Sequence, residues 1–366
     1  MQVTLRKTLA ARRRGTGIMR LLGLSSVLFL AACATQAPVV TKMPEPRPVV
    51  VAPPPVDPAQ VQALNALVAM QDRLYRVGAP LLVNNTELCK GNARNLLGFT
   101  AKNKYSYTSE FVEAAHQTLG LNDRLQIVNV LGGSGAAKAG LRRGDVLLAA
   151  EEKPLPQGQD AESKAAAVLA PLVVGKSSVK LSVARANGNL AVTVPLTHAC
   201  AFGIQLGLAD HVNAYADGHR VLVTRGMLEF ARTEEELAYV LAKEMAHNAL
   251  AHAQKQRMNA TIGGIIDNLV RMHPDLSTMS GASGVKPMPK ELDNAADALA
   301  LYMAARAGYS VDGAAAFWQR LAAQYPPSVA NGYNAIHAPI AARLPAIEKT
   351  VAEIKRKQAA GKPLVP

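Results

Sequence analysis

The sequence predicts an α+β protein built from two different parts. Alternating apolar and polar residues indicate strands at 125–130, 179–184 and 190–195, and the last two flank an Asn-Gly pair that is typical of a hairpin turn. Further along the chain, apolar residues recur at helical spacing after Thr233, and Glu236 stands three residues later, as in a capping box. The first part is therefore expected to be mainly β, and the second mainly helical with one small hairpin.

Length and composition set limits on the function. The chain has 366 residues, which suggests about two domains at about 150 residues each, and its 49% hydrophobic and 18% charged residues are typical of a globular protein. Only 4% of the residues are aromatic, so few side chains can stack on bases, and no nucleic-acid partner is expected despite the net charge of +13. Six of the basic residues lie in the first 33 positions, which contain no Asp or Glu, so the remainder is only mildly basic.

The amino terminus has the pattern of an export signal. A basic stretch ends at Arg20, the apolar run 21–30 follows, and the next residues are Ala31-Ala32-Cys33. The run is too short to span a bilayer, and its end resembles a bacterial lipobox, which implies cleavage and diacylation of Cys33. We therefore expect residues 1–33 to be a lipoprotein signal peptide and the protein to be lipid-anchored in the cell envelope, on the periplasmic face of the outer membrane. An ordinary signal peptide that happens to contain a cysteine is the alternative.

The segment after the signal is expected to hold the folded body away from the membrane. Residues 34–58 are dense in proline, which favours an extended polyproline II linker. Apolar positions at helical spacing then predict a helix over 59–76, within an N-terminal helical segment 59–117. Cys89 and Cys200 remain as an even pair in an exported chain, and we expect a disulfide between them, with two buried free thiols as the alternative.

The mainly β part carries a glycine-rich motif. A helix is expected at about 160–171, and residues 133–147 read GSGAAKAGLRRGDVL between the first predicted strand and that helix. This segment resembles the GSPAxxAGLxxGDxI signature of bacterial PDZ domains and implies a PDZ β-sandwich or barrel over 118–197. A PDZ groove binds C-terminal peptides by adding them as a strand to a sheet edge. Leu119-Gly120-Leu121 is the candidate carboxylate-binding loop, and the alternative is that both leucines are core residues around a turn glycine.

The mainly helical part, 198–358, carries the chemistry, and a short tail 359–366 follows. Strands are expected at 212–216 and 220–224 around Asp217-Gly218, before the capped helix. The stretch VNAYADGHRVLVTRGMLEFARTEEELAYVLAKEMAHNALAH resembles zinc metallopeptidases of the HtpX and CAAX-prenyl-protease type, metallopeptidase family forty-eight, in the branch of exported lipoproteins with a PDZ domain. The resemblance implies a zincin-like domain that cleaves polypeptide substrates in the envelope.

In that family the helix reads HExxH, where two histidines bind zinc and the glutamate activates water. The same window here is Lys243-Glu244-Met245-Ala246-His247, so lysine stands at the position of the first ligand. The resemblance implies Glu244 as the catalytic base and His247 as a zinc ligand. His252, five positions later, would point about 140° away on a continuous helix and is expected to pack or face solvent.

Two later motifs complete the site that the resemblance implies. The stretch 291–309 resembles the family helix that supplies the third ligand, which is Asp293 here in place of glutamate, and Asp297 matches the residue that orients ligands. Residues 334–343 resemble the (S)THPxxxxR motif and imply that His337 lies at the metal and that Arg343 supports it.

Three interpretations of Lys243 remain open at this point. Its ammonium has no lone pair and can replace the metal by pairing with Glu244 or Asp293, which would leave a pseudopeptidase that binds peptides as a scaffold or chaperone-like factor. Alternatively, His247, Asp293 and His337 form a rebuilt zinc site with Glu244 as base, and peptidase activity survives. The third interpretation is an ordinary helix with solvated Lys and Glu.

Overall fold

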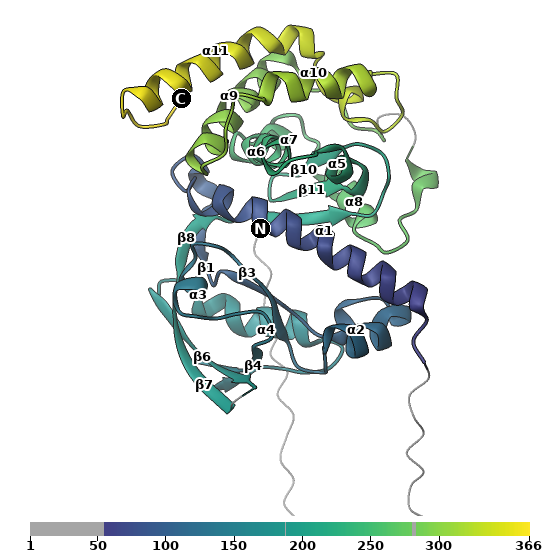
Figure 1. Cartoon of the computed structure of the whole chain (residues 1–366), viewed down its shortest axis with the longest axis vertical. Coiled ribbons are helices and arrows are strands. Elements are labelled where there is room, and N and C mark those ends of the chain that lie inside the picture. The colour runs from purple at the N-terminus through teal and green to yellow at the C-terminus, as the bar shows by residue number, and fades with distance from the viewer. Residues whose placement is uncertain (1–54, 187, 280–282) are drawn as a thin grey trace, which may run out of the picture. The chain divides into compact units, whose positions relative to one another are not determined.

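The computed structural model describes residues 55–186, 188–279 and 283–366. Cys33, the predicted signal peptide and almost all of the predicted linker lie outside the described residues. Among those residues, no helix combines the length and the apolar character that crossing a bilayer requires. Residues 54–366 form one compact unit (Figure 1).

The first helix, α1 (Pro58–Val83), confirms the predicted helix and continues past its expected end. Asp57 caps it by accepting a hydrogen bond from the backbone N–H of Ala59, and Pro58 occupies the first turn, where no intrahelical donor is needed. Its buried residues recur at spacings of three and four, so one stripe of the helix faces the interior. That stripe contacts α2, α6, α9, β8 and β9, whose bounds follow.

The mainly β part is a six-stranded antiparallel sheet with the order β2-β3-β4-β6-β7 and with β5 paired to β4. Strands β6 and β7 form the predicted hairpin in continuous register, from Ser178 opposite Pro195 to Arg185 opposite Gly188. Short helices α2, α3 and α4 accompany this sheet (Figure 1). The bounds of these elements are β2 (Phe99–Lys102), α2 (Val112–Leu119), β3 (Gln126–Val130), α3 (Gly135–Lys138), β4 (Val146–Ala150), β5 (Lys153–Pro154), α4 (Ala161–Leu169), β6 (Ser178–Arg185) and β7 (Gly188–Pro195).

The segment 59–117, expected to be helical, also contains two strands. One is β2, the outermost strand of the large sheet, so the β part begins before residue 118. The other is β1 (Ala93–Leu96), which pairs antiparallel with β8 (Thr197–Cys200) and places Ala93 opposite Cys200. Cys89 and Cys200 form the predicted disulfide, at a sequence separation of 111.

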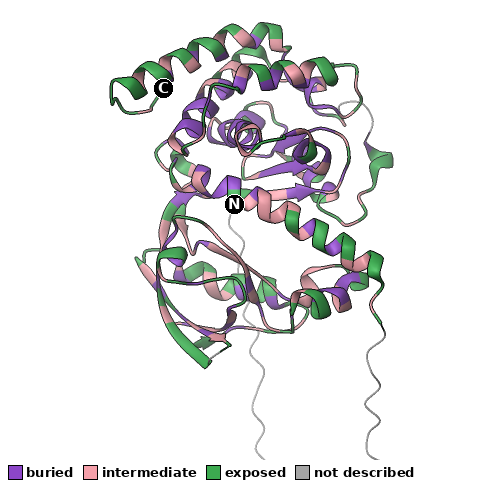
Figure 2. Ribbon diagram, viewed as in Figure 1, coloured by how far each residue is buried: buried purple, intermediate pink, exposed green. Residues whose placement is uncertain are grey.

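The second part combines a three-stranded sheet with a bundle of helices. The sheet has the order β10-β11-β9, with β9 (Gly203–Gly207), β10 (Ala214–Ala216) and β11 (Arg220–Thr224), and its β10–β11 hairpin was predicted. The helices are α5 (Arg225–Phe230), α6 (Glu234–Ala249), α7 (His252–Lys255), α8 (Asn259–Leu269), α9 (Lys290–Arg306), α10 (Ala314–Gln324) and α11 (Ile340–Ala359). The most completely buried segments are α6 and the strands β10 and β11 (Figure 2).

Short 3-10 turns join several of these elements. They lie at Lys90–Asn92, Lys104–Ser106, Ser109–Phe111, Ala170–Leu172, Leu276–Thr278 and Tyr333–Ala335. Two separate apolar clusters follow the two parts: one lies within the six-stranded sheet and α4, and the larger one joins α1, α6, α9 and α10. The polar residues discussed below are embedded in the larger part, on α6, α9 and the segment before α11.

Candidate functional site

Helix α6 brings the central residues of the site into the interior. Half of the predicted capping box forms at its start: the side chain of Thr233 accepts a hydrogen bond from the Glu236 N–H, whereas the Glu236 carboxylate accepts one from the N–H of Arg232 and not from that of Thr233. Arg320 of α10 adds two further bonds to the same carboxylate, at 2.7 and 2.8 Å. Because residues 237–249 are all buried, the charged side chains that this helix carries must find partners inside the protein.

Lys243 finds its partners on α9. Its side chain is fully buried, and its Nζ atom lies 3.1 Å from Oδ1 of Asp293 and 3.0 Å from Oδ1 of Asp297. The ring of Trp318 lies beside the ammonium, with its centroid 5.2 Å away. The pairing with Asp293 was predicted, whereas the alternative pairing with Glu244 is not the one that forms. The prediction of an ordinary helix with a solvated lysine and glutamate is wrong, because both side chains are buried.

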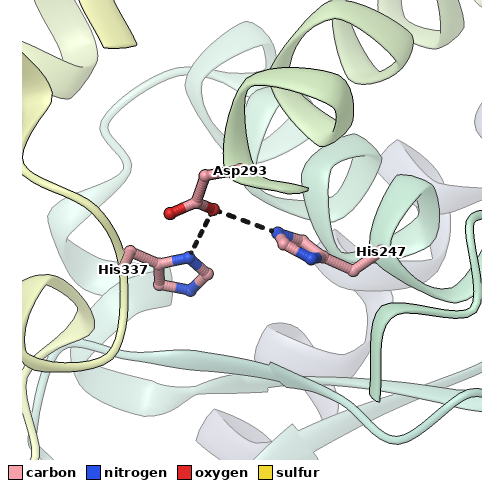
Figure 3. Close-up of side chains that lie close together, drawn as sticks. All are labelled: His247, Asp293 and His337. Atoms are coloured by element: carbon pink, nitrogen blue, oxygen red, sulfur yellow. Dashed lines mark hydrogen bonds and ion pairs between the residues drawn. The ribbon is translucent and has the colours of Figure 1, made fainter. Parts of the chain in front are cut away.

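Asp293 is the hub of the site (Figure 3). Its Oδ1 atom lies 2.8 Å from Nδ1 of His337 and 3.4 Å from Nε2 of His247, and its Oδ2 accepts a hydrogen bond from the backbone N–H of Ala338. Burial by itself would raise the pKa of this carboxyl, but the Lys243 ammonium and then His337 outweigh it and hold the pKa far below its usual range. Asp293 is therefore a carboxylate surrounded by donors.

Asp297 and Arg343 form a second buried pair next to Lys243. The guanidinium of Arg343 donates two hydrogen bonds of 2.7 Å to the two oxygens of Asp297. Burial opposes both charges, yet Lys243 and Arg343 lower the pKa of Asp297, and Asp297 raises that of Arg343. The negative charges of Asp293 and Asp297 are thus compensated by the positive charges of Lys243 and Arg343. Arg343 supports the site through Asp297, as the sequence motif implied.

Glu244 is held by Tyr333, a residue that was not among the predicted site residues. The hydroxyl of Tyr333 donates to Oε1 of Glu244 at 3.1 Å, and its ring is stacked on His337 with centroids 4.0 Å apart. Burial, and then the charge of Glu244, raise the pKa of Tyr333 well above its usual value, so the hydroxyl keeps its proton. Tyr333 lies four residues before His337, in a stretch with no helical or strand period.

His252 is buried against His247, which confirms the expectation that it packs, but the expected direction about 140° away from His247 is wrong. Helix α6 ends at Ala249, and Ala251 adopts a left-handed conformation with φ of 55°, so the chain turns back instead of continuing the helix. This turn brings Nδ1 of His252 to 3.0 Å from Nδ1 of His247. Burial, with His247 as a second cause, lowers the pKa of His252 to about 3, so that its ring is neutral.

A cavity of about 30 Å³ lies between these residues and the edge strand β10. Its walls include Glu244, His247 and His337, together with Ala214 and Ala216 of the strand. This volume accommodates about one water molecule. The side chains that the sequence placed at a catalytic centre therefore lie together around this small cavity.

The residues His247, Asp293 and His337 have the spacing of a metal site, because one ligand atom from each lies within 4.8 Å of the others. Lys243 decides whether an ion fits. Its ammonium cannot coordinate a metal, and it contacts the same Oδ1 atom that an ion would need. At an effective dielectric constant of 20, a single and a double positive charge about 4 Å apart repel by about 8 kcal/mol. The residues present therefore do not fit zinc while the buried ammonium stays in place.

The predicted peptide loop Leu119-Gly120-Leu121 does not border a free sheet edge. Gly120 caps the end of α2 with φ of 67°, and Leu121 is buried in a cluster with Leu64 and Phe111. The strand that follows is β3, which is paired on both sides and cannot accept a further strand. The prediction of a carboxylate loop is therefore wrong, and the alternative of leucines packed around a turn glycine is confirmed for Leu121.

Among the described residues, β2 has an unpaired edge, as do β7 at the other end of the same sheet and β9 and β10 in the small sheet. Strand β2 is preceded by Leu97 and by Gly98, whose φ of 82° favours glycine and whose carbonyl accepts hydrogen bonds from the Leu131 N–H and from Ser134. This tight turn was overlooked in the sequence, where no pattern marked residues 99–102 as a strand. Loop and edge strand together have the layout that peptide addition to a sheet requires.

Fold and site together describe a mixed α/β protein whose helical part encloses a buried His/Asp/His group. Comparison with known families agrees: residues 183–351, just under half of the chain, match the model of Peptidase family M48. The match supports the M48 metallopeptidase family, whose members are typically zinc-dependent.

Among solved structures, the HtrA3 PDZ domain bound to a phage-derived ligand (FGRWV) aligns with this chain at 17% identity. The alignment covers 28% of this chain and 86% of that chain, with a TM-score of 0.21. No curated protein matches the chain.

Proposed function

We propose that this protein is a PDZ-containing member of the M48 family that binds peptides without cleaving them, because Lys243 has replaced the metal. The observation that carries the proposal is the fully buried Lys243 ammonium, 3.1 and 3.0 Å from Asp293 and Asp297. An internal cation at this position neutralises the carboxylates that would otherwise hold an ion. The HExxH motif is on this view degenerate, and the zincin-like fold persists without its cofactor.

Peptides are proposed to bind along the edge of β2. An extended chain that pairs with this strand gains backbone hydrogen bonds whatever its sequence, and we propose that the turn at Leu97-Gly98 receives its C-terminal carboxylate. The partners are thus exposed polypeptide ends, as expected for a scaffold or chaperone-like factor. The proposed lipid on Cys33 and the proline-rich linker would keep this activity at the periplasmic face of the outer membrane.

The zinc content of the purified protein tests the proposal. Elemental analysis is run on the wild type, on Lys243→His, which restores the first ligand of the family, and on Lys243→His/Asp293→Glu, which restores both altered ligands. Lys290→His is the matched control, since Lys290 is exposed at the start of α9. We expect zinc only in the variants at position 243. Stoichiometric zinc in the wild type would refute the replacement by Lys243.

A second candidate function is a peptidase with a rebuilt zinc site of His247, Asp293 and His337, and with Glu244 as general base. The observation in its favour is that Nε2 of His247 is buried with no hydrogen-bond partner among the described residues. This candidate requires zinc in the wild type, its loss in His337→Ala, and casein hydrolysis that Glu244→Gln abolishes. Wild-type protein without zinc and without hydrolysis leaves the peptide-binding function.

A further inference from the structure

An open cavity of about 640 Å³ lies between α1 and the end of β3. A volume of this size is typical of a site for a small molecule. Of the described residues, those of β2 and those of the cluster around Asp293 take no part in its walls. The cavity is therefore separate from both sites discussed above.

The cavity is elongated along the helix. Its α1 wall extends from Asp72 to Val83, and these eleven positions correspond to about 16 Å at 1.5 Å per residue. The opposite wall runs alongside: the Asn129 side chain donates to Oδ1 of Asp72 at 3.0 Å. Gly133 lies against Val83, whose Cγ1 is 3.8 Å from the position of a Cβ on that glycine. One end of the cavity is thus at Asp72 and Asn129, and the other is at Val83 and Gly133.

The end at Asp72 carries two arginines. Arg143 pairs with Asp72 at 2.5 Å, and Arg76, one turn further along α1, pairs with Glu234 at 2.6 Å. These are the only side-chain hydrogen bonds of the two arginines among the described residues, whereas a guanidinium has five N–H donors. The side chains of Arg76 and Arg143 are 61% and 50% exposed, so their remaining donors are open to a ligand. The charged residues in the walls are two arginines and one aspartate, which gives a net charge of +1.

The other end is apolar. Ala79, Pro80 and Val83 on the helix and Val130 on the strand have no polar side-chain group, and Asn84 lies at the exposed rim. A polypeptide along these side chains would bury backbone N–H and C=O groups without partners, which costs free energy. An aliphatic chain has no such groups and gains free energy by leaving water. This end therefore favours a hydrocarbon chain.

From this arrangement we infer that the cavity binds an anionic amphiphile with a single aliphatic chain. The head group pairs with Arg76 and Arg143, in agreement with the net positive charge of the walls, and the chain lies along Pro80, Val83 and Val130. The same chemistry is offered by a fatty acid through its carboxylate and by a single-chain phospholipid through its phosphate. The inference does not depend on whether the cluster around Asp293 holds a metal.

Calorimetric titration with defined probes tests the site. The protein is the full chain with Cys33→Ser, so that no acyl chain of its own competes. Decanoate carries both groups, decan-1-ol lacks the charge, and butanoate lacks most of the chain. We expect decanoate to bind about ten to a hundred times more tightly than decan-1-ol, as for a charge-assisted hydrogen bond, and at least about a hundred times more tightly than butanoate. Equal affinity for decanoate and either analogue, or no binding of decanoate at millimolar concentration, overturns the inference.

Arginine variants assign the head group to the charged end. Arg76→Gln/Arg143→Gln removes both charges and is expected to weaken decanoate at least about tenfold while decan-1-ol keeps its affinity. Arg142→Gln is the matched control, because Arg142 is adjacent and exposed but does not line the cavity. Unchanged binding of decanoate by the double variant, or equal losses in double variant and control, overturns the assignment.

Val83→Phe tests the position of the chain. The larger side chain fills part of the apolar end, so decanoate should bind about tenfold more weakly, which is the effect of about two methylene groups left in water. Hexanoate is too short to reach this end and should keep its affinity. Equal losses for both acids, or no loss for decanoate, overturns this orientation.

Two further ligands separate the possible sources. If decyl phosphate binds more tightly than decanoate and depends equally on the arginines, the site takes a single-chain phospholipid; if decanoate binds more tightly, the site takes a fatty acid. Either result supports the shared chemistry. The peptide acetyl-Ala-Val-Ala-Leu has the carboxylate and apolar side chains but a polar backbone, and it should bind at least about tenfold more weakly than decanoate. Equal or tighter binding of this peptide overturns the choice of an aliphatic chain.

Discussion

Replacement of Lys243 by methionine is the most direct test of the internal cation. The substitution keeps most of the side-chain volume and removes the charge between Asp293 and Asp297. At an effective dielectric constant of 20, each of the two contacts at about 3 Å is worth about 5 kcal/mol, opposed by several kcal/mol for taking the ammonium out of water. Breaking one side of a buried ion pair costs about 3–5 kcal/mol in general.

The lower part of that range is expected here. Asp297 keeps its two hydrogen bonds from Arg343, and Asp293 keeps His337 and the Ala338 N–H, so neither carboxylate is left alone. We therefore expect Lys243→Met to lower the free energy of unfolding by about 3 kcal/mol at neutral pH, measured by urea denaturation. Lys290→Met, on the exposed start of α9, should stay within about 0.5 kcal/mol of the wild type.

The pH dependence gives a second readout. The folded-state pKa values of both carboxyls lie below the ordinary 3.8, so their stabilising contribution is present above that pH and is lost as the pH falls through the folded values. Without Lys243 the folded-state pKa values rise. The difference between wild type and variant should thus be largest at neutral pH and shrink below pH 3.8. A loss of unfolding free energy under about 1 kcal/mol in Lys243→Met would refute charge compensation by Lys243, and so would a difference between variant and wild type that does not change with pH.

Three further predictions concern other contacts. Cys89→Ser/Cys200→Ser should lose up to about 4–5 kcal/mol of stability, the chain-entropy value for so long a loop, and thiol labelling of the unreduced, denatured protein should find neither cysteine free; labelling of both would contradict the bond. Arg343→Lys keeps the positive charge but loses the bidentate hydrogen bond to Asp297, so thermal unfolding should show a loss of stability of about 1.5–3 kcal/mol. An unchanged unfolding midpoint would contradict a stabilising bidentate bond. Between pH 6.5 and about 3, His252 binds a proton in the unfolded state but not in the folded state, so the free energy of unfolding falls as the pH falls. His252→Gln should make the slope of stability against pH shallower by about one proton. Equal slopes for variant and wild type would place His252 in solvent.

Features set by neighbouring residues were predictable from the sequence. The start of α6 depends on Thr233 and Glu236, which lie three positions apart, and the β6–β7 hairpin depends on the alternation of strands with a two-residue connection. The prediction of the Cys89–Cys200 bond needed only the number of cysteines and the expectation that the chain is exported.

Features that depend on distant contacts, or on a turn without a typical turn residue, were not predictable from the sequence. His252 was misplaced because the helix stops at a left-handed alanine, a residue that carries no signal for that conformation. Tyr333 reaches Glu244 across 89 positions of sequence, and no local pattern reports such a contact. The peptide edge was assigned next to Leu119 because the position of a strand within a sheet is a property of the whole fold.

The six-stranded sheet is an insertion in the chain, and two links join the segments that precede and follow it. One link is the pairing of β1 with β8, and the other is the Cys89–Cys200 disulfide. The whole sheet, from β2 to β7, lies between the two cysteines in sequence, and its entry and exit strands run side by side. A protease that cuts once within residues 90–199 would therefore leave a nicked molecule whose mass rises only by that of one water, and the two fragments would separate only after reduction. The disulfide therefore retains both fragments of the molecule after a single cut in any loop of the sheet.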